Sequence, residues 1–157
     1  MAQYSHLFLP LKVGAHFLRN RIVMAPVETG LESHNRFSND FIRFYCERAE
    51  NDVGLFIVKN GAVHFSGLRH FSDPILNASL TNDAVRLTDE IHSRGAKIIL
   101  QLIHHGADAD HLFAMSASRL CNPNTGRTVR RMPRLLISHM ISLYALKSLL
   151  CTSPTSL

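Results

Sequence analysis

Short, nearly unbroken apolar runs recur along the first hundred residues and are separated by polar segments. Residues 22–25 (IVMA), 53–58 (VGLFIV) and 97–102 (KIILQL) are too short for typical helices, and their continuous apolar character indicates burial on both faces. Before the first run, residues 11–20 (LKVGAHFLRN) predict a hairpin with Gly14 near its turn. We therefore expect an N-terminal hairpin followed by three buried strands.

The polar segments between these runs contain two amphipathic helices. Ser38 or Asn39 is placed to cap the first helix, which we expect to end near Asn51. Thr81 is expected to cap the second helix, and Gly95 to terminate it. The alternation of strand and helix predicts right-handed crossovers and a parallel sheet, which is an α/β fold.

Two architectures begin in this way, a doubly wound open sheet and a (β/α)8 barrel. The first strand is not followed by GxGxxG, which disfavours a dinucleotide-binding open sheet. In both architectures ligands bind at the carboxyl ends of the strands. The residues at those ends are Pro26 to Thr29 after the first strand, Lys59 and Asn60 after the second, and Gln101, His104 and His105 at the third.

The charge of the chain divides near residue 110. All 12 acidic residues lie between Glu28 and Asp110, whereas residues 111–157 contain basic residues alone among the charged types. We therefore expect a near-neutral unit over residues 1–110 and a divergent tail over residues 111–157, with the basic pI of about 9.5 a property of the tail. The arginines of the tail have no interleaved aromatic residues, so a solvated basic stretch is favoured and no nucleic-acid partner is expected.

The spacing of cysteine and histidine predicts neither a disulfide framework nor a metal site. The three cysteines are far apart and odd in number, which is typical of a reducing compartment. The N-terminus lacks the charged region and long apolar run of a signal peptide, and we expect a cytoplasmic protein. The remaining histidines, His64 and His111 among them, are expected on the surface or in loops.

A second apolar stretch, residues 134–150, lies in the tail. Its length of about 16 residues is below the roughly 20 needed to span a bilayer, and we expect no membrane partner. Three interpretations stay open: an end produced by truncation or a frame shift, which is favoured, a helix that covers the exposed edge of the sheet, and a helix that binds a membrane surface or a partner.

Several of these segments together resemble a known family. LFLPLKVG with LRNRIVMAPVETG, then YCERAENDVGLFIV, then LTDEIHSRGAKIILQLIHHG are similar in order and spacing to the amino-terminal portion of the FMN-dependent Old Yellow Enzyme, or NADH:flavin oxidoreductase, family. The nearest likeness is to its bacterial 2,4-dienoyl-CoA reductase branch. The likeness covers about residues 4–107, and NPNTGR at 122–127 resembles the next loop. It implies a partial TIM (β/α)8 barrel, with an N-terminal hairpin, about three strand–helix units and an atypical C-terminal tail.

The resemblance also implies a flavin site. Pro26, Val27 and Glu28 would run under the flavin. Asn60 would lie beside it, and Gln101 would bind the pyrimidine edge of the isoalloxazine, where a side-chain amide offers both a donor and an acceptor. FMN is the implied cofactor and NAD(P)H the implied reductant. The implied substrate is a small molecule with an activated C=C bond, an enone or an enoyl or dienoyl thioester. No catalytic residue is assigned, because the substrate-binding and proton-donor motifs of the family are not found in the rest of the chain.

Two departures from the family pattern bear on the flavin. Glu28 stands where many relatives have Thr, Cys or His, and its carboxylate would disfavour the anionic reduced flavin through charge repulsion. Residues 104–107 (HHGA) lack the arginine of the usual HxGR.

The length of the chain bears on its activity. A complete barrel needs about 250 residues, so we expect this chain alone to be incomplete and to lack turnover. The alternative is a non-enzymatic barrel remnant that associates with a partner, or with a second copy, through the exposed edge of its sheet.

Overall fold

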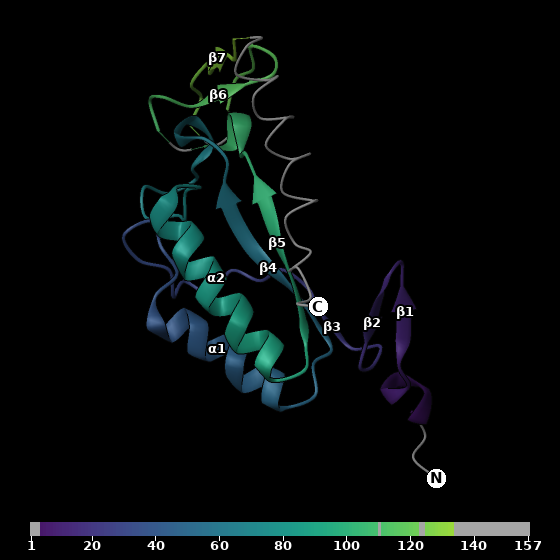
Figure 1. Cartoon of the computed structure of the whole chain (residues 1–157). Helices are drawn as coiled ribbons and strands as arrows, with labels where there is room; N and C mark the ends of the chain where they lie inside the picture. Colours follow the sequence, from purple (N-terminus) through teal and green to yellow (C-terminus); the bar gives the residue numbers. More distant parts are fainter. Residues whose placement is uncertain (1–3, 110, 123–124, 134–157) are drawn as a thin grey trace.

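A three-stranded parallel sheet with two helices against one face forms the centre of the chain (Figure 1). The computed structural model describes residues 4–109, 111–122 and 125–133. The sheet has the order β3 (Val23–Met24), β4 (Leu55–Ala62), β5 (Lys97–Ile103), and both of its pairings are parallel. The predicted α/β organisation is therefore confirmed. Strand β4 runs to Ala62, beyond the predicted end at residue 58.

The predicted N-terminal hairpin is also confirmed. After a short 3-10 helix, η1 (Ser5–Phe8), β1 (Leu11–Val13) pairs antiparallel with β2 (His16–Leu18). Gly14 lies in the turn with φ of 59°, a left-handed conformation that glycine adopts without a steric penalty. The hairpin forms its own two-stranded sheet and precedes β3 in the chain.

Helix α1 (Asn39–Glu50) begins as the sequence predicts. The Ser38 hydroxyl accepts a hydrogen bond from the Phe41 N–H at 3.0 Å, which satisfies one of the free donors of the first turn. The buried side of the helix carries Phe41, Tyr45 and Ala49, which recur at four-residue spacing and face the sheet.

The N-cap of helix α2 (Ala78–Ser93) lies four residues before the expected cap. Asn77 is the N-cap, and its side chain accepts from the Leu80 N–H at 2.9 Å, so the prediction of Thr81 as the cap is wrong. The Leu76 N–H donates to the Ala62 carbonyl at 2.8 Å, which holds the chain against β4 up to the residue before the cap. The helix therefore starts at the first cap-forming residue after this anchor, and Leu80 becomes a fully buried core residue. Gly95, with φ of 76°, follows the helix as predicted.

The hydrophobic core lies between the two helices and the face of the sheet that they cover. Its largest fully buried apolar side chains are those of Phe41, Tyr45, Phe56, Val58, Leu80, Leu87 and Ile91. The opposite face is less covered: Val23 and Ile99 are 45% and 46% exposed. Among the described residues, the sheet therefore has one packed face and one open face.

Loops at the carboxyl end of the sheet continue into short elements. These are η2 (Phe65–Gly67) after β4, η3 (Gly106–Asp108) after β5, and a short parallel pair of β6 (Met115–Ser116) with β7 (Arg130–Arg131). In Figure 1, β6, β7 and the loops that follow β4 and β5 gather beyond the tips of those strands. The apolar stretch 134–150 lies outside the described residues. No helix in the described ranges is long and apolar enough to cross a bilayer.

Candidate functional site

A register shift between β4 and β5 brings two of the predicted site residues together. Val58 pairs with Leu100 and Gly61 with Leu102, so Lys59 and Asn60 both stand opposite Gln101. Such a β-bulge leaves one residue out of the ladder and increases the local twist, and bulges are frequent beside active sites. The bulge therefore places Asn60 and Gln101 side by side near the carboxyl ends of the strands.

The third group of predicted residues follows β3. Pro26, Val27 and Glu28 lie in an irregular and exposed segment, with Val27 41% exposed. Glu28 reaches strand β4, because its Oε1 atom is 3.8 Å from the Nζ atom of Lys59. Of the three, Glu28 thus makes a side-chain ion pair with the neighbouring strand.

Lys59 is a buried cation held by two carboxylates. Its side chain is 9% exposed, and its Nζ atom lies 3.5 Å from Oε1 of Glu32, whose side chain is 6% exposed. Glu28 is the second partner, and it also lies 4.0 Å from Nη1 of Arg69. A buried ammonium group is tolerated when it is paired in this way, since the attraction offsets the loss of hydration. The two carboxylates and two cations together carry no net charge.

Tyr45 of helix α1 lies close enough to feel the charges of this ion cluster, which consists of Glu28, Glu32, Lys59 and Arg69. Tyr45 is fully buried, and its ring makes an edge-on contact with Phe56 of β4 at a centroid distance of 5.7 Å. Burial raises the pKa of Tyr45 to about 12, and the negative charge of Glu32 contributes in the same direction. The Tyr45 hydroxyl therefore stays protonated over the physiological range.

A chain of hydrogen bonds joins the loops that follow β4 and β5. Nδ1 of His64 is 2.8 Å from Oγ of Ser66, which is 3.0 Å from Nε2 of His104. The Gly106 N–H donates to Nδ1 of His104 at 3.0 Å, so in the neutral ring the proton resides on Nε2. Nε2–H of His104 therefore donates to Ser66, whose hydroxyl in turn donates to His64. Ser66 is 1% exposed, which keeps its hydroxyl out of reach of a substrate and indicates a structural role.

Close packing against glycine keeps the His104 ring in place. A Cβ atom at Gly67 would lie 2.4 Å from Cδ2 of His104, a distance that van der Waals contact forbids. Burial lowers the pKa of His104 to about 4, with smaller contributions from the charges of neighbouring histidines, His64 foremost. The ring is neutral at physiological pH, as the hydrogen-bond chain requires.

Several of these residues carry no signal in the sequence. Glu32 lies in a polar loop, Ser66 lies in the short η2 turn, and the contact of Gly67 with His104 joins segments that are far apart in the sequence. Lys59 is recognisable as a residue at the end of a strand, but its burial is not. His111 lies in a loop, which is one of the two expected locations, but it is only 8% exposed, because the rings of Phe65, Phe71 and Phe113 lie against it. No group of side chains within the described ranges has the arrangement of a metal site.

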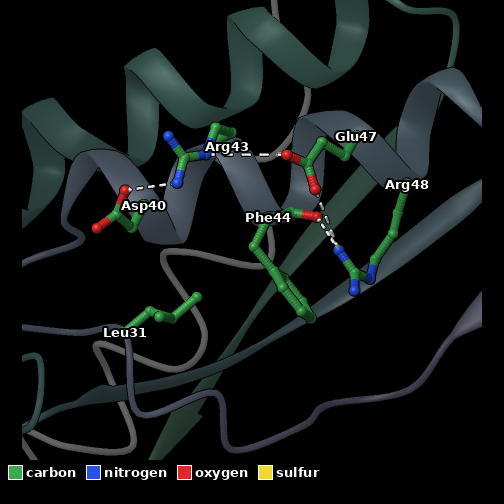
Figure 2. Close-up of a pocket in the computed structure, with 6 residues that line it drawn as sticks. All are labelled: Leu31, Asp40, Arg43, Phe44, Glu47 and Arg48. Atoms are coloured by element: carbon green, nitrogen blue, oxygen red, sulfur yellow. Dashed lines mark hydrogen bonds and ion pairs between the residues drawn. The ribbon is translucent and has the colours of Figure 1, made fainter.

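A shallow hollow on the outer side of α1 is not a comparable site (Figure 2). Arg43 lies 3.0 Å from Asp40 and 3.8 Å from Glu47, and the guanidinium group of Arg48 stacks over the Phe44 ring at 3.4 Å. These charged groups are paired with neighbours on the same helix, as is common on solvated helix faces, and they leave no requirement for a ligand.

Comparisons with known proteins place this geometry in context. A sequence model of the NADH:flavin oxidoreductase / NADH oxidase family matches residues 6–130. The chain is 28% identical over 145 residues to a metal reductase of Desulforamulus reducens, covering 90% of this chain and 22% of that protein. It is 32% identical over 117 residues to an NADPH dehydrogenase of Bacillus subtilis, covering 71% of this chain and 35% of that protein.

The fold has known counterparts as well. The Old Yellow Enzyme from Pichia sp. AKU4542 superposes with a TM-score of 0.76 at 24% identity, over 87% of this chain and 40% of that one. This likeness confirms the predicted partial TIM barrel, which corresponds to the N-terminal part of the complete barrel. The chain spans less than half the length of each of these three proteins. They do not distinguish the 2,4-dienoyl-CoA reductase branch from the rest of the family.

Proposed function

This chain belongs to the NADH:flavin oxidoreductase / NADH oxidase family, which includes Old Yellow Enzyme, and we propose that it forms the amino-terminal part of an FMN-binding barrel. The proposed reaction is that of an NAD(P)H-dependent oxidoreductase acting on the activated C=C bond of an enone or of an enoyl or dienoyl thioester. FMN, when bound, supplies the hydride chemistry, and the protein positions the reactants. The observation that carries the proposal is the bulge that sets Asn60 beside Gln101.

The residues at the strand ends fit the pyrimidine edge of a flavin. Gln101 is exposed near the carboxyl end of β5, and its amide offers one donor group and one acceptor to the alternating N–H and C=O groups of such a ring. Asn60 lies in the bulge beside it, where the strand departs from regular pairing. Pro26 and Val27 provide exposed chain at the end of β3 for the flavin to rest on.

The ion cluster changes the role expected of Glu28. Its carboxylate is shared between Lys59 and Arg69, so its negative charge is offset locally. We expect the repulsion between Glu28 and an anionic reduced flavin to be weak as long as both cations are present, because opposite charges within about 4 Å largely cancel at longer range. Lys59 thus acts as a positioning residue for Glu28.

A flavin titration tests this proposal. We expect the chain to quench FMN fluorescence in a saturable manner and Gln101→Ala to weaken binding about tenfold or more, because a ligand group then loses its hydrogen-bond partner. Lys97→Gln, at the opposite end of the same strand, is the control and should bind FMN as the wild type does. Equal binding by Gln101→Ala and the wild type would contradict the assignment.

Catalytic turnover by the chain alone is tested separately from FMN binding. The main sheet of the described residues has three parallel strands, whereas a closed barrel of this type has eight. We expect the chain alone to show no NADPH-dependent reduction of 2-cyclohexenone, measured by loss of absorbance at the NADPH maximum. An active, yellow preparation of the purified chain would overturn this expectation.

A second candidate function is association through the sheet. Among the described residues β5 has a strand neighbour on one side, and Val23 and Ile99 are exposed on the open face. Unpaired edges of this kind favour pairing with another chain or with a second copy. Light scattering after size exclusion should then show a dimer that Ile99→Lys converts to a monomer, and a monomeric wild type would contradict it.

A further inference from the structure

The face of the sheet opposite the helices carries a continuous row of apolar side chains. Val23 of β3 pairs with Leu55 of β4, and Ile57 of β4 pairs with Ile99 of β5. Because successive side chains of a strand alternate between its two faces, and Phe56 lies in the core, Leu55 and Ile57 lie on the opposite face. We call Val23, Leu55, Ile57 and Ile99 the apolar row.

The apolar row needs a segment that covers it. In a (β/α)8 barrel the helices lie outside, and the opposite face of each strand points into a closed and packed interior. The three strands of the main sheet cannot close in this way, and Val23 and Ile99 are 45% and 46% exposed. Contiguous apolar side chains that remain exposed mark a site of interaction.

The tail of the chain has a composition and a length that match this face. Residues 134–150 (RLLISHMISLYALKSLL) lie outside the described residues and contain one charged side chain after Arg134, that of Lys147. A stretch of about 16 residues is about 24 Å long even as a helix, and β5, with seven residues, is about 23 Å long. The stretch is therefore long enough to cover the sheet from end to end.

The last described residues bring the start of this stretch to the carboxyl end of the sheet. The Met132 N–H donates to the carbonyl of Ser116 in β6 at 2.8 Å, and Met132 is 6% exposed, so the chain is anchored up to this residue. Strands β6 and β7 lie beyond the tips of β4 and β5 (Figure 1). From this anchor, residues 134–150 can run back along the sheet towards its amino end.

We propose that residues 134–150 cover the apolar row of their own chain. A segment joined to the sheet by a short connection is present at an effective concentration of about millimolar, whereas a second copy competes only at the concentration of the protein in solution. Burial of apolar side chains under an apolar segment requires no charged partner. The tail therefore occupies the face that association through the sheet would otherwise use.

Photo-cross-linking of the full chain tests this proposal. Ile99 is replaced by p-benzoylphenylalanine, and the protein is irradiated at low micromolar concentration. Trypsin cleaves after Arg134 and Lys147, so the tail is recovered as the single peptide 135–147 and identified by mass spectrometry. We expect this peptide to be attached to the probe at position 99 of the same chain. The control is the same probe at Val85, which is 54% exposed on α2 and should capture the peptide at least tenfold less.

Substitutions in the tail test whether its apolar character is what holds it on the sheet. Ile141→Asp together with Leu143→Asp should lower the yield of the cross-link at Ile99 at least fivefold, because buried charges without partners are unfavourable. Ser138→Asp together with Ser142→Asp adds the same two charges at positions that are already polar, and should lower the yield less than twofold. Equal yields in the two double variants would contradict the proposal.

Two further results would overturn the proposal. A cross-link that joins two chains, seen as a band of twice the mass, would assign the face to a second copy. Absence of peptide 135–147 from the probe at Ile99, or its capture in equal yield at Val85, would show that the tail does not cover the apolar row. The cross-link needs no flavin, so its failure and the failure of the FMN titration are independent of each other.

Discussion

The contact between Gly67 and His104 gives the most exacting test of the structure. In Gly67→Ala the new Cβ would lie 2.4 Å from Cδ2 and 2.5 Å from Cγ of His104, so the imidazole must move. The ring is held at both nitrogens, by the Gly106 N–H at Nδ1 and by Ser66 at Nε2. It cannot move away from the alanine without loss of one or both hydrogen bonds.

The expected cost follows from these two effects. Overpacking in a close-packed region costs about 1–3 kcal/mol, and each lost hydrogen bond contributes about 1 kcal/mol. We therefore expect Gly67→Ala to lower the free energy of unfolding by about 3 kcal/mol. This is a large fraction of the roughly 5–15 kcal/mol of a typical domain.

Urea unfolding followed by circular dichroism measures this cost. Gly61→Ala is the matched control, because the atoms nearest to its new Cβ are leucine methyl carbons at 3.5 Å and 3.6 Å, an ordinary contact distance. We expect its free energy of unfolding to change by less than about 1 kcal/mol.

A double-mutant cycle ties the cost to the imidazole. On a His104→Ala background the obstructing ring is gone, and Gly67→Ala should then cost under about 1 kcal/mol. A Gly67→Ala variant as stable as the wild type, or one with the same cost on both backgrounds, would refute the described packing of His104.

Three other predictions concern stability. Because burial lowers the pKa of His104 from 6.5 to about 4, the unfolded chain takes up a proton first on acidification. The free energy of unfolding should therefore fall between about pH 6.5 and pH 4, and less steeply in His104→Gln, as a pH series of urea titrations would show. Lys59→Met leaves the buried Glu32 carboxylate without its cation and should lower the free energy of unfolding by about 3 kcal/mol in urea titrations. The control is Lys97→Met at an exposed position, which should lower it by less than about 0.5 kcal/mol. Equal losses in the two variants would argue against the buried ion pair. Asn77→Ala should lower the free energy of unfolding, measured by thermal denaturation, by about 1 kcal/mol, and Thr81→Ala should lower it clearly less. A larger loss in Thr81→Ala would indicate that Thr81 is the cap of α2.

The elements of the fold could be predicted because their signals are local. Ser38 caps α1, Gly14 forms the hairpin turn, and the three apolar runs became parallel strands. Each signal arises within a few residues of where it acts. The start of α2 could not be placed in the same way, since Asn77 and Thr81 are both capping residues by type. The hydrogen bond between Leu76 and Ala62, residues far apart in the chain, decides between them.

The same distinction applies to the candidate site: the sequence predicts where its residues lie along the chain, and the folded structure determines which of them are brought together. The sequence locates Gln101, Asn60 and Glu28 near strand ends, and the resemblance to flavin oxidoreductases is the basis for proposing a flavin as their ligand. The bulge that sets Asn60 beside Gln101 depends on how two strands align, which neither strand encodes alone. The offset charge of Glu28 likewise depends on Lys59 and Arg69, which other segments supply.

The sequence by itself therefore determined the order of strands and helices, the family, and the edge of the sheet where a ligand site is expected. Hydrophobic periodicity, helix caps and the residues at strand ends are signals that arise from residues close together in the chain. Only the tertiary structure decided which side chains at that edge are charged and paired, which are buried, and which donors remain free. His111 shows the difference most clearly: the sequence predicts only a surface or loop residue, and the rings of Phe65, Phe71 and Phe113 from two loops leave it 8% exposed. Burial and pairing are properties of contacts between distant segments, and those contacts exist only once the chain has folded.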